Sequence, residues 1–515
     1  MKKFILLPTL FISSYILAQI PEDVLRYSFY PQNGTARSLA IGGAMGSLGG
    51  DITATFVNPA GIGNYRTGEF VFTPGFMFNN NKSNFRGTDT KSSESNFALG
   101  PIGLVFGSSN RYNPTTSQAI SLVVTQTADY NNTIQYKGLN NFSSYTEQWA
   151  EQIAKSGLSI DDALNEPVFA YGPAPALYTY LVDTFRNNVG NVQLRGLPEN
   201  ILDAGQALMQ ENTVESRGGM YEVALGYASN KKDKFLWGFS IGIPILDYSS
   251  TTTYKETDTS SNLSNGFGSF TYVDEFRTSG VGVNAKIGLI FKPVEYVRVG
   301  LALHTPTYMA SLKDVRTTDV SANTENYEGV RNVSSTEFTN GQAGQNKYTM
   351  LTPWKFLVSG SYVLREVENV KNQKGFITAD IEYVTHSSSS FYTDNEAATP
   401  DETNYFKALN QVVKNEYKGN FNFRLGGELK FNTIMTRLGF AYYTDPYRDD
   451  ELKASRMVLS GGLGYRHKGM FIDVTYVHNM TKDVHVPYRL ESAPNVMANI
   501  RNTTGNAVLT LGFKI

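Results

Sequence analysis

Residues 36–65 read ARSLAIGGAMGSLGGDITATFVNPAGIGNY. This stretch is rich in glycine and alanine, and it carries little charge. It shows neither the alternation of a strand nor the spacing of a long helix, whereas glycine lets a backbone pack closely and adopt a positive φ. A segment of this kind can fold compactly inside a structure that encloses it. We therefore interpret it as the plug of a membrane β-barrel, and the rest of the chain supports this interpretation.

The composition of the chain favours β structure. Its 515 residues suggest two to four domains by length alone, and one large barrel with a plug and long loops is the competing interpretation. The 31 tyrosines and 31 phenylalanines, together with 46 glycines, favour strands joined by many turns. The net charge of −2 gives no electrostatic case for a nucleic-acid partner. The chain has no cysteine, so disulfides cannot stabilise it.

The N-terminus has the features of a secretory signal peptide. Lys2 and Lys3 form its basic end, residues 4–17 form its apolar core, and Ala18 is a plausible last residue before cleavage. The apolar run is too short to span a membrane as a helix. The predicted organisation is a signal peptide at 1–18, an N-terminal hatch at 19–67 and a barrel at 68–515, with an extracellular helical insertion at 131–218.

Several later segments alternate between apolar and polar residues. Examples are VGVNAKIGLIF at 281–291, FNFRLGGELK at 421–430 and the final AVLTLGFKI at 507–515. Each has one apolar face and one face that carries polar or charged residues, which is the pattern of a transmembrane barrel strand. A half-buried strand of a soluble protein shows the same pattern, so alternation alone leaves both alternatives open.

The lengths of the connections favour the barrel. The predicted strands alternate between long and tight connections, as the strands of an outer-membrane barrel do. Counting 268–279 separately would give fifteen strands and reverse this alternation, so 268–291 is treated as one strand. The fold class is all-β, a 14-stranded antiparallel transmembrane β-barrel with an N-terminal hatch in its lumen. The predicted strands are 68–78, 94–107, 117–130, 219–229, 235–254, 268–291, 295–312, 352–364, 375–387, 420–430, 435–443, 456–466, 469–479 and 505–515.

The longest connection, 131–218, contains three segments with helical spacing. They are 143–156, 176–187 and 198–210, and Pro198 stands where a helix can begin. A disordered surface loop is the alternative, but it would expose several large apolar side chains. We therefore expect a partly helical cap over the outer mouth. The side chains in question are Trp149, Ile153, Leu177, Leu181, Leu202 and Leu208.

With these features in place, the chain resembles the FadL/TodX/OmpP1 family of outer-membrane transporters for hydrophobic molecules. The stretch Asn58-Pro59-Ala60-Gly61 and the upstream Gly42-Gly43-Ala44 carry most of the resemblance. The resemblance spans nearly the whole mature chain and is weakest in 131–218. Further matching residues are Arg37, Asp51, Ala54, His304 to Thr307, Thr352-Pro353, Ala379-Asp380, Arg424 to Glu428, and Arg437 to Gly439.

The resemblance implies a barrel that takes up long-chain fatty acids or aromatic hydrocarbons. The resemblance also implies a route. The ligand would be captured at the outer face and transferred to an apolar pocket, and it would then pass a moving hatch or leave through a side opening in the wall. The surrounding lipid and lipopolysaccharide of the outer membrane would be further partners. Other relatives serve protein secretion or bind haemin, so a protein-partner component and a haemin receptor are the alternative functions.

The hatch residues are the candidate gate. The side chain of Asn58 can cap a turn, Pro59 fixes φ, and Gly61 permits a reversal. Small residues would let the segment slide or rearrange within the lumen; the alternative is that the hatch only fills space and stabilises the barrel. The candidate hatch and gate residues are Gly42, Gly43, Ala44, Asp51, Asn58, Pro59, Ala60 and Gly61.

The predicted lumen faces carry charges of both signs. Our main interpretation is a paired network that holds the barrel interior and the hatch. The alternative is that Arg424 binds the carboxylate of a fatty acid through charge-assisted hydrogen bonds. The charged residues of these faces are Lys286, Asp380, Glu382, Arg424, Glu428, Lys430 and Asp473.

No motif predicts a catalytic site, a cofactor or a metal centre. Ser and Asp are plentiful, but no GxSxG sequence is accompanied by a suitably placed histidine, so we expect no enzyme. Haem would need an axial ligand such as His478 or His485, whose spacing is no known motif. The acidic tip with Asp445, Asp449, Asp450 and Glu451 could bind a divalent cation that bridges lipopolysaccharide, although a solvated loop is the simpler interpretation.

Overall fold

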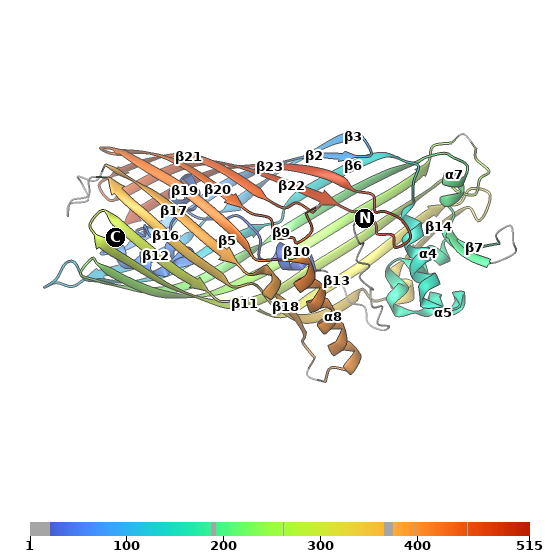
Figure 1. Cartoon of the computed structure of the whole chain (residues 1–515), viewed down its shortest axis with the longest axis horizontal. Coiled ribbons are helices and arrows are strands. Elements are labelled where there is room, and N and C mark those ends of the chain that lie inside the picture. The colour runs from blue at the N-terminus through green and yellow to red at the C-terminus, as the bar shows by residue number, and fades with distance from the viewer. Residues whose placement is uncertain (1–20, 187–191, 261, 365–373, 396, 451) are drawn as a thin grey trace, which may run out of the picture.

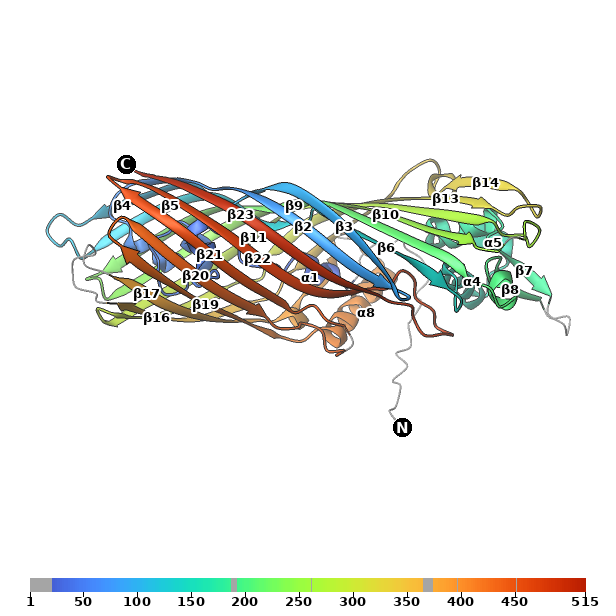
Figure 2. The same ribbon diagram turned by 90° about the horizontal axis from the view of Figure 1, so that it is seen from above.

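The computed structural model describes residues 21–186, 192–260, 262–364, 374–395, 397–450 and 452–515. These residues form a closed antiparallel β-barrel of 14 strands, which confirms the predicted fold class (Figure 1). The N-terminal hatch lies inside the barrel, and a lobe of helices and strands rises at one end, here termed the outer end (Figures 1 and 2). The predicted signal peptide, residues 1–18, lies outside the described residues.

Several of the 14 wall strands are interrupted and consist of two elements. The first pairs with the last, since β1 and β2 both bond to β23 and close the barrel. In chain order the wall is β1 (Glu69–Phe72) with β2 (Pro74–Phe85), β3 (Thr88–Leu99) with β4 (Ile102–Ser109), β5 (Ser117–Asp129) with β6 (Asn132–Asn140), β9 (Leu208–Lys231), β10 (Phe235–Asp258), β11 (Ser269–Val294), β12 (Val297–His304) with β13 (Tyr308–Asn323), β15 (Gly344–Leu351) with β16 (Lys355–Leu364), β17 (Gly375–Val384) with β18 (Ser390–Thr393), β19 (Asn420–Phe431), β20 (Ile434–Tyr443), β21 (Arg456–His467), β22 (Met470–His485) and β23 (Ala498–Lys514).

The outward face of the wall is apolar. On β10 the outward side chains from Phe235 through Trp237 to Ile245 are 41–48% exposed, whereas the inward Leu236 and Ser240 are fully buried. Beyond Ile245 the outward residues of β10 are polar, so the apolar band ends there. An apolar band outside and a polar interior define a membrane-spanning barrel. Among the described residues, no helix combines the length and the apolar character needed to cross a membrane.

The wall strands confirm the predicted strand positions and exceed them at the outer end. The predicted strand 268–291 is one strand, β11, which runs from Ser269 to Val294 and has 26 residues. β9 and β10 have 24 residues each, about twice what a membrane requires, and they rise into the lobe. The helix predicted at 198–210 is therefore wrong in its second half, because β9 begins at Leu208 and pairs with β10 from that residue.

The lobe contains the partly helical insertion. The predicted helix at 143–156 is present as α4 (Tyr145–Ser156). The helix predicted at 176–187 ends at Tyr178, because Tyr180 adopts a φ of 57° and Val182–Arg186 form strand β7, which pairs with β8. Residue 187 lies outside the described residues. Valine and phenylalanine in β7 favour strand over helix. The remaining lobe elements are α5 (Ile160–Asn165), η2 (Pro167–Tyr171), α6 (Pro173–Tyr178), β7 (Val182–Arg186), β8 (Val192–Gly196), α7 (Glu199–Asp203), β14 (Val330–Ser334) and η3 (Ser335–Phe338).

Glu256 fixes the lobe to the barrel. Its carboxylate, on β10 above the apolar band, accepts hydrogen bonds from Ser144 Oγ at 2.6 Å, from Tyr145 N at 2.8 Å and from Gln210 Nε2 at 2.8 Å. Ser144 is the N-cap of α4, so a buried carboxyl of the wall holds the start of the longest helix of the lobe.

We expect the lobe to be more stable at pH 5 than at pH 8. Burial raises the pKa of Glu256 from 4.5 to about 7, so between these values the closed lobe holds a proton that the opened lobe releases. This stabilisation is complete below about pH 4.5 and is lost as the pH rises through 7. Hydrogen exchange of the α4 amides, corrected for intrinsic rates, measures it. Burial also raises the pKa of Glu147, in the first turn of α4, to about 7, so Glu256→Gln should reduce the pH dependence without removing it. Protection that increases toward pH 8 in the native protein would contradict this expectation.

The N-terminal hatch consists of short helices joined by tight turns. They are α1 (Asp23–Arg26), α2 (Ala36–Ala40), α3 (Ala54–Val57) and the 3₁₀ helix η1 (Pro59–Asn64). Asn58 caps η1 with its side chain and Pro59 is its first residue, as the turn chemistry predicts. Helix α8 (Pro400–Glu416) follows the short η5 (His386–Ser388) and β18, and it projects from the side of the barrel, well short of the lobe (Figure 1).

Candidate functional site

A belt of inward-facing glycines surrounds the hatch. A Cβ atom added to Gly426 would lie 2.3 Å from the carbonyl oxygen of Ile41, and one added to Gly439 would lie 2.0 Å from the nitrogen of Gly42. Contacts this close leave no room for a side chain at these two wall positions. The hatch backbone is therefore fitted against the wall around the lumen. The belt comprises Gly107 on β4, Gly226 on β9, Gly238 on β10, Gly288 on β11, Gly300 on β12, Gly426 on β19, Gly439 on β20 and Gly462 on β21.

Asn58 is the central polar anchor of the hatch. Its side-chain amide donates hydrogen bonds to the carbonyl oxygens of Gly46 at 2.6 Å, Leu289 at 3.2 Å and Leu301 at 3.3 Å. Its Oδ1 accepts from the nitrogen of Ala60 at 3.2 Å. One fully buried side chain thus joins two parts of the hatch to the adjacent wall strands β11 and β12.

The other predicted hatch residues lie around this anchor. Gly42 and Gly43 have φ angles of 67° and 77°, which favour glycine. The carbonyl oxygen of Ala44 accepts a hydrogen bond from Thr378 Oγ1 at 3.3 Å. Asp51 joins two parts of the hatch, since its carboxylate accepts hydrogen bonds from Thr35 Oγ1 at 2.7 Å and from Thr53 N at 2.9 Å. Pro59, Ala60 and Gly61 form the first turn of η1. Their predicted role in gating stays a prediction.

Arg424 is engaged in the lumen network. Its Nη2 lies 2.8 Å from Glu382 Oε1, and its guanidinium lies 5.7 Å from the ring centroid of Tyr443. The network continues with Arg437, which pairs with Glu428 at 2.6 Å and with Asp473 at 2.5 Å. The structure therefore brings most of the predicted lumen charges together as pairs. Asp380 Oδ2 accepts from Gly46 N at 3.0 Å and so fastens the hatch to β17.

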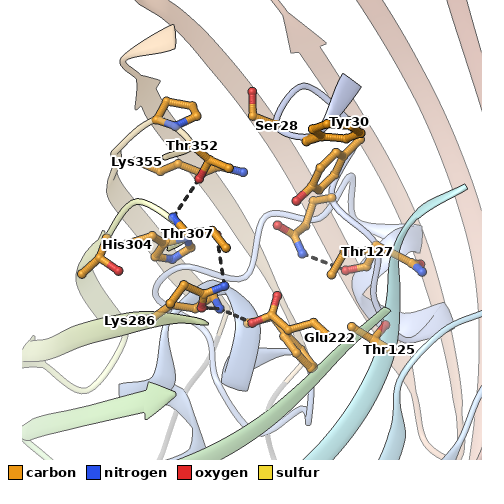
Figure 3. Close-up of a pocket in the computed structure, with 17 residues that line it drawn as sticks. Ser28, Tyr30, Thr125, Thr127, Glu222, Lys286, His304, Thr307, Thr352 and Lys355 are labelled. Atoms are coloured by element: carbon orange, nitrogen blue, oxygen red, sulfur yellow. Dashed lines mark hydrogen bonds and ion pairs between the residues drawn. The ribbon is translucent and has the colours of Figure 1, made fainter. Parts of the chain in front are cut away.

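A cavity of about 70 Å³ lies above the hatch and contains a cation that the sequence analysis did not identify. Figure 3 shows Lys355 and His304 at one side of this cavity, and Tyr30 of the hatch at the other side, toward the top of the view. The Lys355 ammonium lies 5.2 Å from the ring centroid of Tyr30, and within the described part of the chain no carboxylate forms an ion pair with it. Lys286 and Glu222 in the same cavity pair with each other. The cavity therefore has an excess positive charge.

A second lumen cavity, of about 310 Å³, lies beside the first. Tyr30, Gln32 and Asn33 line both cavities, so this piece of chain is the partition between them. The second cavity extends to Ala98 on β3 and to Gln126 on β5. It therefore reaches the wall where these two strands face each other.

The wall is split between β3 and β5. β3 forms a backbone ladder with β2 only, and β5 bonds to β4 as far as Val124 and to β9; among the described residues no ladder joins β3 to β5 or β6. Side chains close the gap instead. The Leu99 nitrogen donates to Gln126 Oε1 at 2.9 Å, and Asn33 Nδ2 of the hatch donates to the carbonyl oxygens of Leu99 at 3.1 Å and Gln126 at 2.6 Å.

Asparagines seal the split further toward the outer end. Asn96 Nδ2 donates to Asp129 Oδ2 at 2.7 Å, and Asn81 Nδ2 donates to the carbonyl oxygen of Thr133 at 2.8 Å. Near the lower end of the split Phe97 points outward and is 60% exposed, so the split begins within the apolar band. The asparagine runs at 79–81 and 131–132 were a signal in the sequence that side-chain amides replace backbone pairing here.

The residues considered for a haem ligand and for a divalent cation do not come together in the structure. His478 shares the outward face of β22 with Tyr476, whereas His485, seven residues on, points inward and hydrogen-bonds Tyr136 at 2.8 Å. Asp445 uses both carboxylate oxygens within its own loop, for Tyr447 N and Ala454 N, and Glu451 lies outside the described residues. Within the described ranges, no three His, Cys, Asp or Glu side chains gather as a metal site.

A closed 14-stranded barrel with an apolar exterior and an N-terminal hatch in its lumen defines a hatch-plugged channel of the outer-membrane type. Many solved structures are similar to this chain, and two of them are described here. One is a FadL homologue of Pseudomonas aeruginosa, with a TM-score of 0.53, 12% identity and coverage of 94% of this chain and 99% of that one. The other is the toluene transporter TodX of P. putida, with a TM-score of 0.52, 12% identity and coverage of 94% and 99%. No protein-family model and no curated protein matches the chain. The fold predicted from the resemblance is confirmed.

Proposed function

We propose that this protein takes up hydrophobic molecules across the outer membrane, and that long-chain fatty acids are its ligands. The observation that carries the proposal is the charged lumen cavity with Lys355, which hatch residues from Tyr27 to Phe56 and side chains of the wall enclose. A neutral hydrocarbon forms no ion pair with a cation in the lumen. A fatty acid brings a carboxylate, which forms charge-assisted hydrogen bonds with an ammonium. The toluene transporter that shares the fold supports the more general part of the proposal.

Lys355 suits the carboxylate better than Arg424 does. Arg424 is buried and paired with Glu382, so binding a ligand there would require this pair to break. Lys355 contacts the ring of Tyr30 instead, and exchanging that contact for a carboxylate breaks none of the ion pairs seen among the described residues. A fatty-acid head group is therefore assigned to Lys355.

The proposed route leaves through the wall. The fitted glycine belt opposes movement of the whole hatch, whereas side-chain hydrogen bonds alone close the split. Separating Asn33 and Gln126 would join the second cavity to the apolar band beside Phe97. In this arrangement the N-terminal hatch acts as the gate, because it supplies the Asn33 amide that keeps the split closed.

We expect Lys355→Met to weaken the binding of a long-chain fatty acid about tenfold or more, because one charge-assisted hydrogen bond contributes roughly 1.5–3 kcal/mol. Lys355→Arg should retain most of the affinity. Binding of a fatty alcohol of the same chain length should not change, because it carries no charge. Fluorescence titration of the purified barrel measures all three.

The matched control is Lys407→Met, which removes an exposed lysine from helix α8 and should leave affinity unchanged. An equal loss of alcohol and acid binding in Lys355→Met would show that the variant damages the lumen rather than the head-group site. Unchanged fatty-acid binding in Lys355→Met would rule out the assignment of the head group.

A further inference from the structure

We infer that the larger lumen cavity is a second ligand site, centred on Arg456, and that it binds the head group of a fatty acid that carries a hydroxyl group near its carboxylate. This inference rests on the proposed function and adds to it a preference for hydroxylated fatty acids. The site is the cavity of about 310 Å³ that adjoins the split in the wall.

Arg456 provides the positive charge of this site. It lies on β21 and lines the cavity, and its guanidinium carbon lies 4.7 Å from the ring centroid of Phe29. Its Nε is buried without a hydrogen-bond partner, and among the described residues no carboxylate forms an ion pair with it. A buried cation without a counter-charge is costly, and a carboxylate binds a guanidinium through two parallel charge-assisted hydrogen bonds. Arg456 therefore suits the carboxylate of a ligand.

An acidic residue of the cavity, Asp483, provides an acceptor near this cation. Its Oδ1 accepts a hydrogen bond from Val484 N at 2.8 Å, and it forms no ion pair with a described side chain. The other acidic residue, Asp129, lies at the split and accepts from Gln126 Nε2 at 3.0 Å. A hydroxyl group can donate to Asp483 while the carboxylate of the same ligand binds Arg456.

The strand register places a further hydrogen-bonding group beside Arg456. Arg456 pairs with Thr481 on β22, and Asn479, two residues away on β22, lines the same cavity. The Oδ1 of Asn479 has no hydrogen-bond partner among the described residues. In a sheet, the Cβ atoms of directly opposite residues lie about 4.5–5.5 Å apart and those of diagonal residues about 7–8 Å apart. The hydroxyl group that this site binds is therefore close to the carboxylate, as in a 3-hydroxy acid.

The remaining lining of the cavity also favours the oxygen-bearing part of a ligand. Eight asparagines and two glutamines line it. An alkyl chain that filled this space would displace water from these amides and would give them no hydrogen bond in return. A head group with several oxygen atoms replaces the hydrogen bonds of the displaced water.

Side-chain amides connect the site to the split. Asn502, which pairs with Thr481, donates through Nδ2 to Asn81 Oδ1 at 2.7 Å. Asn81 Nδ2 in turn donates to the carbonyl oxygen of Thr133 at 2.8 Å, across the split. The Arg456 site therefore belongs to the cavity through which the proposed route leaves the lumen, and a head group released from Lys355 would bind there next.

The test compares hexadecanoic acid with 3-hydroxyhexadecanoic acid by isothermal titration calorimetry of the purified native barrel. The hydroxy acid should bind about three- to tenfold more tightly, because one additional hydrogen bond contributes a factor of this size. Arg456→Met should remove this preference, so that both acids bind with the affinity of the Lys355 site. Arg456→Lys keeps the charge and should retain part of the preference.

Three further variants locate the preference. Asn479→Leu has a similar volume but no hydrogen-bonding groups, and it should reduce the preference while leaving the affinity for hexadecanoic acid unchanged. Lys355→Met should keep the preference, because it alters the other cavity. The matched control is Arg501→Met, which removes an exposed arginine from the outward face of β23 and should also keep it.

Equal affinity of the native barrel for the two acids would overturn the inference. A preference that survives in both Arg456→Met and Asn479→Leu, with the barrel folded, would overturn it too, as would a preference that is lost only in Lys355→Met. If neither acid binds to the native barrel, the proposed function itself fails, which separates that outcome from failure of this inference alone.

Discussion

Replacing Gly426 with valine is expected to displace the part of the hatch around Ile41 from the wall and to open the barrel. A Cβ at this position would lie 2.3 Å from the carbonyl oxygen and 2.5 Å from the Cβ of Ile41. Overpacking against side chains commonly costs about 1–3 kcal/mol, and here the obstacle is backbone held on both sides, so the cost should exceed that range. Current across a planar lipid bilayer measures the result, because a displaced hatch should convert a closed barrel into a steady ion channel.

The adjacent glycine provides the matched control for this variant. Gly427 lies on the outward, lipid-facing side of the same strand, and an added Cβ there would meet nothing closer than 3.3 Å. Gly427→Val should therefore keep the barrel closed. If Gly426→Val gives a folded barrel that stays closed as well, the hatch has clearance at the wall and the fitted belt is not what holds it.

Replacing Asn58 with aspartate is expected to destabilise the hatch by at least about 3 kcal/mol. The two side chains have nearly the same shape, but aspartate has no amide protons for the carbonyl oxygens of Gly46, Leu289 and Leu301. A buried negative charge would face three oxygens that carry partial negative charge, and at 1.4 kcal/mol per factor of ten this raises the open population of the hatch about a hundredfold or more.

Hydrogen exchange of the amides in residues 36–65 measures this effect. Asn58→Ala should have a smaller effect, because it leaves carbonyl groups unpaired without adding charge. Asn404→Asp, on the exposed side of α8, makes the same chemical change away from the lumen and should have no effect on the hatch. Native protection of the hatch in Asn58→Asp would show that this residue is not the anchor.

Much of the fold could be predicted from local patterns. Strand alternation identified the wall, and the alternating lengths of the connections indicated one strand at 268–291, which the structure shows as β11 (Ser269–Val294). The predictions failed where local spacing competes with distant pairing. Residues 204–210 were predicted as helix, but Leu208 pairs with Asp258 on β10, which is a contact that no local pattern contains.

The candidate site was less accessible from sequence. The Asn58 turn could be predicted, because a turn is a local structure. The glycine belt could not, because its eight members lie on eight strands and become one surface only when the barrel closes. Lys355 follows the matched Thr352-Pro353, yet the lack of an ion pair with a described carboxylate depends on Glu222 and Glu382, which are far away in sequence, being paired with Lys286 and Arg424.

The central claim, that this barrel takes up long-chain fatty acids, is tested most directly in a bacterial host that lacks its own outer-membrane fatty-acid transporter. Uptake of a radiolabelled C18 fatty acid should be restored by the native protein and largely lost with Lys355→Met at equal surface expression. Absence of uptake with a folded, surface-exposed native barrel would contradict the claim.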